Sequence, residues 1–390
     1  MRSHFLLALL NLGSALVAQT TMVGWRDDVF PNTSGAGTLN LACRVYYPST
    51  VLGAGMPLKA QVGGYPVILH LHGAGGHGRA TPEYSAAIAA GGYILVMQDT
   101  ASSSSSTQYS DAMATITALQ AENTKSTSFY KGQLDMTRFG VIGHSMGGGN
   151  TLRVLAASTV PKLGVTFAST NGTSSAPNVK VPVLLVVGQG DTVVSPSTSL
   201  NNYNSLTNYT GSKALFQFNN ECNHATMLAT PLNQVQADIF TRTMKVTVGF
   251  LNTHLRGETA GYEEVAGQAA RAEPRLTQLY TGYERPLTWY TWLQNGLFTA
   301  RVATACEPGP SFLMASLQQV AIQTPYGILG LDPATLVVLP GTMPTTKLMT
   351  FDITLPAELL IGGLALPFQA IGANRAVQQK LSNVVATRID

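Results

Sequence analysis

The fold is decided by the stretch FGVIGHSMGGG, residues 139–149. Phe139–Ile142 is a short apolar run typical of a buried strand, and the pattern from Gly147 to about Ala157 predicts a helix. Between them stands a G-x-S-x-G motif, which chance alone would produce roughly 0.2 times in a chain of this glycine and serine content. Because the motif joins a strand to a helix, we interpret it as a nucleophile elbow with Ser145 at its tip. The tight turn leaves no room for a Cβ atom at the two motif glycines.

Apolar runs and helical patterns alternate on both sides of this motif. The runs predict strands at 39–47, 66–71, 93–97, 183–187 and 214–218, and the helical patterns predict helices at 82–90, 109–120 and about 232–254. Strands and helices at this spacing predict an α/β domain with a mostly parallel central sheet flanked by helices. The five serines at 102–106 are interpreted as a solvated loop after a strand.

The texture of the chain changes toward its end. Residues 257–310 have scattered aromatics without a clear period, and we treat them as a connecting segment. From about residue 311, short β-like runs are punctuated by proline and glycine, with no helical pattern between them. This spacing predicts a small C-terminal all-β module, sandwich-like, over 311–390. The catalytic domain is then expected over 19–256.

Residues 1–18 read as a secretory signal peptide, with Arg2 followed by an apolar stretch and then small residues. The stretch is shorter than the roughly 20 residues that a membrane span needs, and no later segment is long and apolar enough. An exported, secreted or cell-surface protein without a stable membrane span is expected, with an uncleaved anchor as the alternative. The net charge of +3 and the lack of a Lys/Arg run argue against nucleic-acid binding.

Three cysteines, at 43, 222 and 306, are too few for a disulfide scaffold. In an exported protein one bond among them is expected, with buried free thiols as the alternative.

Ser145 needs a base, because a serine hydroxyl is a poor nucleophile near neutral pH. The usual base is an imidazole oriented by a carboxylate, and the order along an elbow-bearing chain is serine, acid, histidine. Asp191 follows one expected strand end and His224 follows the next, so these residues complete a candidate triad. Asp99 also follows a strand but precedes Ser145, and Glu221 is a second rival close to His224.

The glycine-rich stretch HGAGGHG at 72–78 follows another expected strand. A tetrahedral intermediate needs an oxyanion hole, in which one donor contributes about 3 kcal/mol. We expect the donors to be the backbone N–H groups of Ala74 and of Met146, the residue after the nucleophile. Gly73 and Gly75 would let this backbone approach the substrate closely. His144, next to Ser145, should point away from the nucleophile and is interpreted as lining the cleft.

Three histidines in the same region, at 70, 72 and 77, invite a zinc interpretation. No carboxylate or cysteine at ligand spacing accompanies them. We therefore expect neither a metal nor an organic cofactor.

From about Val45 to His254 the chain resembles the dienelactone-hydrolase-related group of α/β-hydrolases, which includes bacterial cutinases and polyester (PET) hydrolases. The resemblance is carried by YYP at 46–48, the glycine loop at 73–76, the strand and Asp-Thr at 96–100, FGVIGHSMGGG at 139–149, GDTVVSP at 190–196 and the histidine loop ending at His224. It implies the α/β-hydrolase fold, with Ser145, Asp191 and His224 as the triad and Ala74 and Met146 as the oxyanion donors.

Two departures from the family pattern concern the substrate. Polyester hydrolases usually have an aromatic residue where Ala74 stands and a tryptophan in the loop around Thr170, and these grip a substrate ring. Aromatic polyester turnover is therefore left open, since each such contact is worth about 1 kcal/mol or less. Thr170 stays a candidate substrate-binding residue, together with Gly73, Gly75 and His144.

We expect a secreted serine carboxylic-ester hydrolase that acts on a small-molecule or polymeric ester through an acyl-enzyme. The alternatives are a serine peptidase of related fold and a surface-binding protein with a vestigial hydrolase domain. The acyl chain, the alcohol and the oligomeric state stay open.

Overall fold

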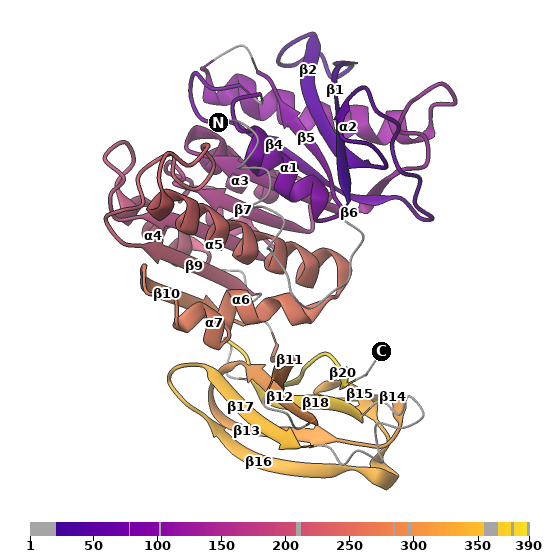
Figure 1. Ribbon diagram of the computed structural model, residues 1–390, viewed down its shortest axis with the longest axis vertical. Coiled ribbons are helices and arrows are strands. Elements are labelled where there is room, and N and C mark those ends of the chain that lie inside the picture. Colours follow the sequence, from indigo (N-terminus) through magenta and orange to yellow (C-terminus); the bar gives the residue numbers. More distant parts are fainter. Residues whose placement is uncertain are drawn as a thin grey trace. The chain divides into compact units, whose positions relative to one another are not determined.

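A ten-stranded sheet forms the centre of the first part of the chain (Figure 1), in the order β10-β9-β8-β7-β6-β4-β5-β2-β1-β3. The computed structural model describes residues 21–77, 79–100, 103–207, 212–283, 285–294, 298–354, 366–375 and 378–387. The strands are β1 (Met22–Pro31), β2 (Asn40–Ser49), β3 (Gly53–Ala54), β4 (Tyr65–Leu71), β5 (Ile94–Gln98), β6 (Leu134–His144), β7 (Leu163–Phe167), β8 (Val183–Gly188), β9 (Lys213–Phe218) and β10 (Leu276–Gly282). The expected signal peptide lies outside the described residues.

The middle of this sheet is parallel. β4 pairs in parallel with β5 and β6, and β6-β7 and β7-β8 are also parallel, whereas β1 and β2 run antiparallel at one side. Every residue of β4, β5, β7 and β8 is buried. Strands covered on both faces appear in a sequence as unbroken apolar runs, so most of them could be located from sequence. The predicted α/β class with a mostly parallel sheet is confirmed.

Helices flank the sheet, as Figure 1 shows. They are α1 (Pro82–Ala90), α2 (Ser105–Thr124), α3 (Met146–Ala157), α4 (Pro196–Ser205) and α5 (Gln234–Leu251), and α5 continues as a π-helical turn over Asn252–Arg256. α1 packs beside α5, and α2 beside α3.

The run of serines is where the sequence interpretation was wrong in part. Ser104 is the N-cap of α2, and its side chain accepts a hydrogen bond from the Thr107 N–H at 3.3 Å. Ser105 and Ser106 form the first turn of the helix rather than a loop. Serine is a poor residue in a helix interior but a good one at its beginning, because its oxygen satisfies an otherwise unpaired N–H group. Residues 101 and 102 lie outside the described residues.

The chain separates into two compact units. The first consists of the described parts of Met1–Tyr209, Leu215–Arg256 and Pro274–Leu279, and the second of those of Thr210–Ala214, Gly257–Glu273 and Tyr280–Asp390. All the candidate site residues belong to the first unit.

The second unit is built mainly from short antiparallel strands. One sheet has the order β11-β12-β17 and another the order β16-β13-β18-β19, with β20 also paired to β18, and β14 and β15 form a hairpin. The bounds are β11 (Leu287–Gln294), β12 (Phe298–Ala305), β13 (Glu307–Ala315), β14 (Gln319–Thr324), β15 (Gly327–Leu331), β16 (Val337–Met343), β17 (Leu348–Thr354), β18 (Leu366–Ala373), β19 (Gln379–Leu381) and β20 (Val385–Thr387). Val302 of the first sheet and Leu313, Phe368 and Ala370 of the second share one core.

The segment at 257–273 packs on the strands of this second unit. It contains the short helices α6 (Glu263–Ala266) and α7 (Gln268–Arg271). Buried Tyr262 lies edge-on to Trp289 of β11 with ring centroids 5.8 Å apart, and the Trp289 Nε1–H donates to Glu263 Oε2 at 2.7 Å. The predicted start of the β module at residue 311 falls inside β13, so β11 and β12 precede it. The sequence did not reveal β11, because the aromatic and threonine residues of 287–294 form a strand without the alternation of apolar and polar residues that marks one in sequence.

The three cysteines are buried and unpaired. The expectation of one disulfide was therefore wrong, and the alternative of buried free thiols is what the structure contains. Burial raises the pKa of the Cys222 thiol to about 12.

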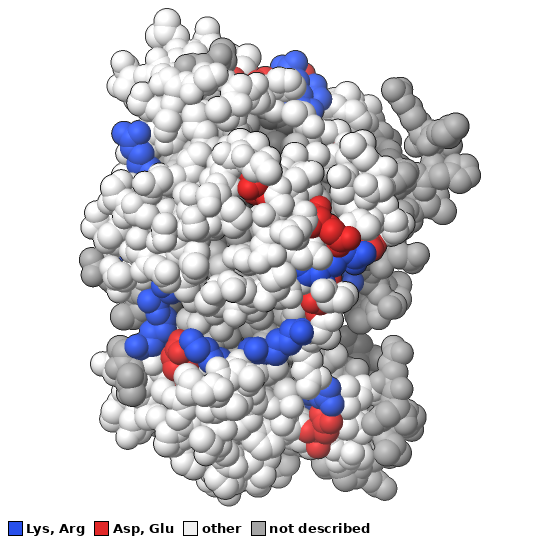
Figure 2. Space-filling view, turned by 90° about the vertical axis from the view of Figure 1, so that its left-hand side faces the viewer, with Lys and Arg blue, Asp and Glu red and all other residues white. Residues whose placement is uncertain are grey.

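Charged side chains are sparse on the surface, as expected from a content of 11%. On the face in Figure 2 they lie in a few separate groups on an otherwise uncharged surface. Among the described residues, no helix is both long and apolar enough to cross a membrane.

Candidate active site

Ser145 stands at the sharp turn between β6 and α3. Its backbone has φ 55° and ψ −119°, and it is one of three non-glycine residues with positive φ among those described. A non-glycine residue with these backbone angles is strained, and the conformation persists only where the surrounding structure holds it. The Ser145 N–H donates to Phe167 O at 2.9 Å, and its carbonyl accepts from the N–H groups of Gly148 and Thr170 at 2.9 and 3.0 Å. This geometry is that of the predicted elbow.

The two motif glycines are required by close backbone contacts. An ideal Cβ at Gly143 would lie 2.1 Å from Gly147 O, and one at Gly147 would lie 2.1 Å from Leu71 O. Both distances are far below a van der Waals contact, and backbone atoms cannot move away cheaply. The prediction that the turn excludes a Cβ at both positions is confirmed, and Gly147 in addition lets α3 approach the end of β4.

The structure brings Asp191 and His224 together. Asp191 Oδ2 accepts a hydrogen bond from His224 Nδ1 at 2.7 Å, and Asp191 Oδ1 accepts from the N–H groups of Val193 and Val194, both at 2.9 Å. The carboxylate is completely buried, whereas the imidazole retains 17% exposure. Because a carboxylate only accepts, Nδ1 carries the proton, and Nε2 of the neutral ring has its lone pair free to act as a base.

The loops that carry this pair are fastened to each other. The Gln189 N–H donates to Phe218 O, and the Gly190 N–H donates to Cys222 O. A Cβ at Gly188 would lie 2.0 Å from Cys222 O. Asp191 and His224 are therefore positioned by two strand-end loops that are hydrogen-bonded to each other.

His144, the residue before Ser145, is hydrogen-bonded to the backbone of His224. Its Nε2 donates to the backbone oxygen of His224 at 2.8 Å, and the two imidazole rings lie with centroids 4.6 Å apart. Burial lowers the pKa of His144 to about 4, so the ring is neutral near pH 7. Sequence reasoning identified His144 only as a lining residue, and its hydrogen bond to the histidine loop could not be read from spacing.

The glycine loop forms a tight turn beside Ser145. The Gly76 N–H donates to Gly73 O at 3.0 Å, and Gly75 has φ 69°, as the third residue of a type II turn requires. A Cβ at Gly73 would lie 3.2 Å from Ser145 Cβ, so the turn and the serine are neighbours. The turn bond uses the N–H of Gly76, not that of Ala74.

Thr170 also lies against the elbow. Its N–H and its Oγ1 both donate to Ser145 O, at 3.0 and 3.3 Å. Asn202 of α4, which sequence reasoning did not identify, fixes the same loop through hydrogen bonds from its Nδ2 to Thr170 O and to Ser169 Oγ, both at 2.9 Å.

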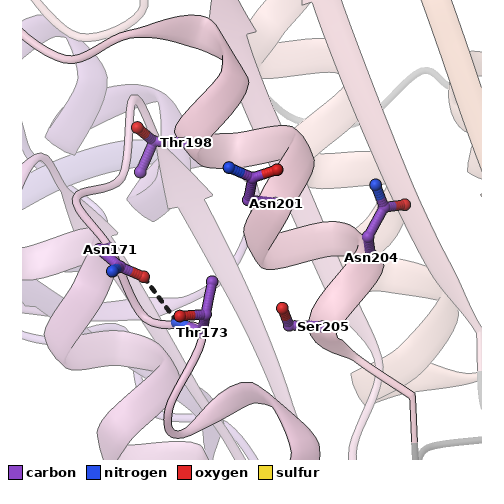
Figure 3. A pocket seen from close by; sticks show the side chains of 6 residues that line it. All are labelled: Asn171, Thr173, Thr198, Asn201, Asn204 and Ser205. Atoms are coloured by element: carbon purple, nitrogen blue, oxygen red, sulfur yellow. Dashed lines mark hydrogen bonds between the residues drawn. The ribbon is translucent and has the colours of Figure 1, made fainter.

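A polar hollow of about 400 Å³ lies between the residues that follow Thr170 in this loop and helix α4 (Figure 3). Asn171 and Thr173 line it from the loop, and the Thr173 N–H donates to Asn171 Oδ1 at 2.9 Å. The remaining lining residues come from α4 and are uncharged: Thr198, Asn201, Asn204 and Ser205.

The rival residues have other partners. Asp99 Oδ2 lies 3.6 Å from Arg79 Nε, and Glu221 Oε2 lies 3.5 Å from Arg275 Nε. Buried His70 pairs through Nδ1 with the Tyr84 hydroxyl at 3.2 Å, and His72 Nδ1 donates to Gly73 O at 2.7 Å. Among the residues that the structure describes, no group of three or more His, Cys, Asp or Glu side chains is arranged to hold a metal ion.

A serine elbow, an aspartate–histidine pair and a glycine turn at the end of a mostly parallel sheet are the arrangement of the α/β-hydrolase class. A family model described as PET hydrolase-like, named PETase, matches residues 32–259. The match covers more than half of the chain, and the chain belongs to this family.

Two curated relatives are similar to this chain over shorter stretches. "Bis(hydroxyethyl) terephthalate hydrolase" of Streptomyces coelicolor is 36% identical over 95 residues, which is 24% of this chain and 30% of that protein. "Cutinase est1" of Thermobifida alba is 30% identical over 139 residues, which is 35% of this chain and 46% of that protein. The chain thus matches less than half the length of each relative.

Proposed function

We propose that this protein is a carboxylic-ester hydrolase with Ser145 as nucleophile, His224 as general base and acid, and Asp191 as the residue that orients the imidazole. The 2.7 Å hydrogen bond from His224 Nδ1 to Asp191 carries the proposal, because it leaves Nε2 as an acceptor for the serine proton. Membership in the PET hydrolase-like family and the names of the two relatives support esters as the substrate class.

The proposed reaction has two halves. His224 Nε2 takes the Ser145 proton while Oγ attacks the ester carbonyl, and the backbone N–H groups of Ala74 and Met146 stabilise the resulting oxyanion. The intermediate collapses to an acyl-enzyme, and the departing alkoxide takes the proton from His224. A water molecule then loses a proton to His224, attacks the acyl carbon and releases the carboxylic acid, while Oγ regains its proton. Each half returns the histidine to its neutral state.

The substrate range that we propose is esters without a required aromatic ring. Thr170 lies in the loop where polyester hydrolases usually have a ring-gripping tryptophan, and its hydroxyl donates to Ser145 O. Ala74 offers only a methyl group at the other position. Ester hydrolysis needs neither ring, so we expect activity on short neutral esters to exceed activity on aromatic polyesters. We also propose an extracytoplasmic location, on the pattern of residues 1–18.

The test is a panel of p-nitrophenyl esters of increasing chain length, with Ser145→Ala as the partner of the natural protein. Loss of the nucleophile should lower the rate by about 10⁶. Equally slow hydrolysis by both proteins would overturn the proposal in favour of a vestigial hydrolase domain. Turnover of peptide amides without turnover of esters would favour a peptidase.

A further inference from the structure

Buried amide side chains connect the glycine turn to the helix that begins at Ser145. Gln108, in the first turns of α2, is completely buried, and Asn150 of α3 is 2% exposed. Gln108 Nε2 donates to the carbonyl of His72 at 2.8 Å, and Gln108 Oε1 accepts from Asn150 Nδ2 at 2.9 Å. One glutamine thus bridges the start of the glycine loop and the body of α3.

Asn150 is itself held in a single orientation. Its Nδ2 also donates to Ser105 O at 2.9 Å, and its Oδ1 accepts from Ser105 Oγ at 3.0 Å. Exchanging the amide nitrogen and oxygen would place the Asn150 amide oxygen against Ser105 O and Gln108 Oε1, which are both acceptors. The Asn150 amide that donates to Gln108 Oε1 is therefore fixed, and as a result Gln108 Nε2 points toward His72 O.

The position of this bridge matters because the two proposed oxyanion donors belong to different segments. Ala74 follows His72 by two residues in the loop after β4, whereas Met146 begins α3, four residues before Asn150. Sheet pairing ends at Leu71 and Gly143, so it does not hold the turn. On one side the missing Cβ of Gly147 lets α3 approach Leu71 O, and on the other Gln108 binds the next carbonyl along the chain.

We infer that Gln108 is a positioning residue for the oxyanion hole, acting through His72 O and Asn150 to set the separation of the Ala74 and Met146 N–H groups. The inference rests on the proposed function, because it needs an oxyanion at these donors. Gln108 does not touch the reacting atoms. Its contribution lies in the transition state, where the two N–H groups must both reach one oxygen.

The test is the variant Gln108→Met, which keeps the length and bulk of the side chain and removes both hydrogen bonds. Loss of a whole oxyanion donor lowers kcat by about 10²–10³, and a displaced donor retains part of its effect. We expect kcat for p-nitrophenyl butyrate to fall about 10-fold or more, with KM within about twofold. The affinity for a trifluoromethyl ketone that adds Ser145 and forms a hemiketal oxyanion should fall by the same factor as kcat/KM.

A matched control is Gln369→Met in the second unit. Gln369 is also a buried amide with three hydrogen bonds, to Gly330 N and to the carbonyls of Ile328 and Ser382. It should lose stability without losing kcat. Unchanged kcat in Gln108→Met, an equal loss in both variants, or a change confined to KM would overturn the inference.

If Gln108→Met does not fold, Gln108→Asn decides by the same measurements, because the side chain keeps its amide but is too short to reach His72 O. A normal kcat in Gln108→Asn would overturn the positioning role. The two levels of failure are distinguishable. Full activity in Ser145→Ala would remove the proposed function, whereas an inactive Ser145→Ala beside a fully active Gln108→Met would remove only the positioning role.

Discussion

Replacing Asp191 by asparagine separates the charge of the acid from its shape. The carboxylate is buried and makes three hydrogen bonds, one to His224 Nδ1 at 2.7 Å and two to the N–H groups of Val193 and Val194 at 2.9 Å. Asparagine has a single oxygen. If that oxygen stays on the two backbone N–H groups, its NH₂ group faces Nδ1.

The alternative orientation is more costly. It would aim the NH₂ group at the N–H groups of Val193 and Val194, so that both hydrogen bonds are lost at a cost of about 0.5–1.5 kcal/mol each. The imidazole is expected to change tautomer instead, with Nδ1 as acceptor and the proton on Nε2. A ring in that state cannot take the Ser145 proton. The same exchange in serine proteases lowers kcat about 10⁴-fold, which corresponds to about 5 kcal/mol in the barrier.

The assay is kcat for p-nitrophenyl butyrate at about pH 7.5, with thermal unfolding as a check on the fold. Asp99→Asn is the control, because Asp99 also follows a strand but lies beside Arg79 at 3.6 Å with partial exposure, where an ion pair contributes about 1 kcal/mol or less. We expect near-normal kcat in the control. An Asp191→Asn protein within tenfold of the natural one, or an equal loss in Asp99→Asn, would refute the reasoning.

Three further predictions concern stability. Burial lowers the pKa of His70 to about 3, so the unfolded chain binds the extra proton first and the free energy of unfolding falls as the pH drops from about 6.5 toward 3. In urea melts, His70→Leu should flatten the decline in unfolding free energy between about pH 7 and 4.5. Equal slopes in the variant and the natural protein would contradict this. Trp289→Phe removes a 2.7 Å hydrogen bond to Glu263 and should destabilise the second unit by roughly 1–3 kcal/mol, seen in calorimetry as earlier melting of one transition; an unchanged thermogram would speak against it. Ser104→Ala removes the cap on the Thr107 N–H and should cost about 1 kcal/mol in chemical denaturation, whereas a loop serine would cost nothing measurable.

Local sequence was sufficient wherever sterics or burial act over a few residues. Gly143 and Gly147 are fixed by backbone contacts within one turn and its neighbouring strand, and the elbow could be recognised from its motif together with the strand and the helix predicted on either side. The strands β4 and β8 are buried on both faces, so they appear as apolar runs. β7 was missed because its five residues include Gly164 and Thr166, which interrupt the apolar signal.

The order of Ser145, Asp191 and His224 along the chain was enough to nominate them, because strand ends of a parallel sheet meet at one edge. Only the tertiary structure decided how they are held. The hydrogen bond from Gln108 to His72 O joins residues 36 positions apart, and the one from His144 to His224 O joins residues 80 positions apart. No local pattern encodes such pairs, because a buried amide acquires its partner only when separate elements pack together. The sequence by itself nominated the candidate groups, and packing determined the hydrogen bonds that hold Asp191, His224 and His144 in place.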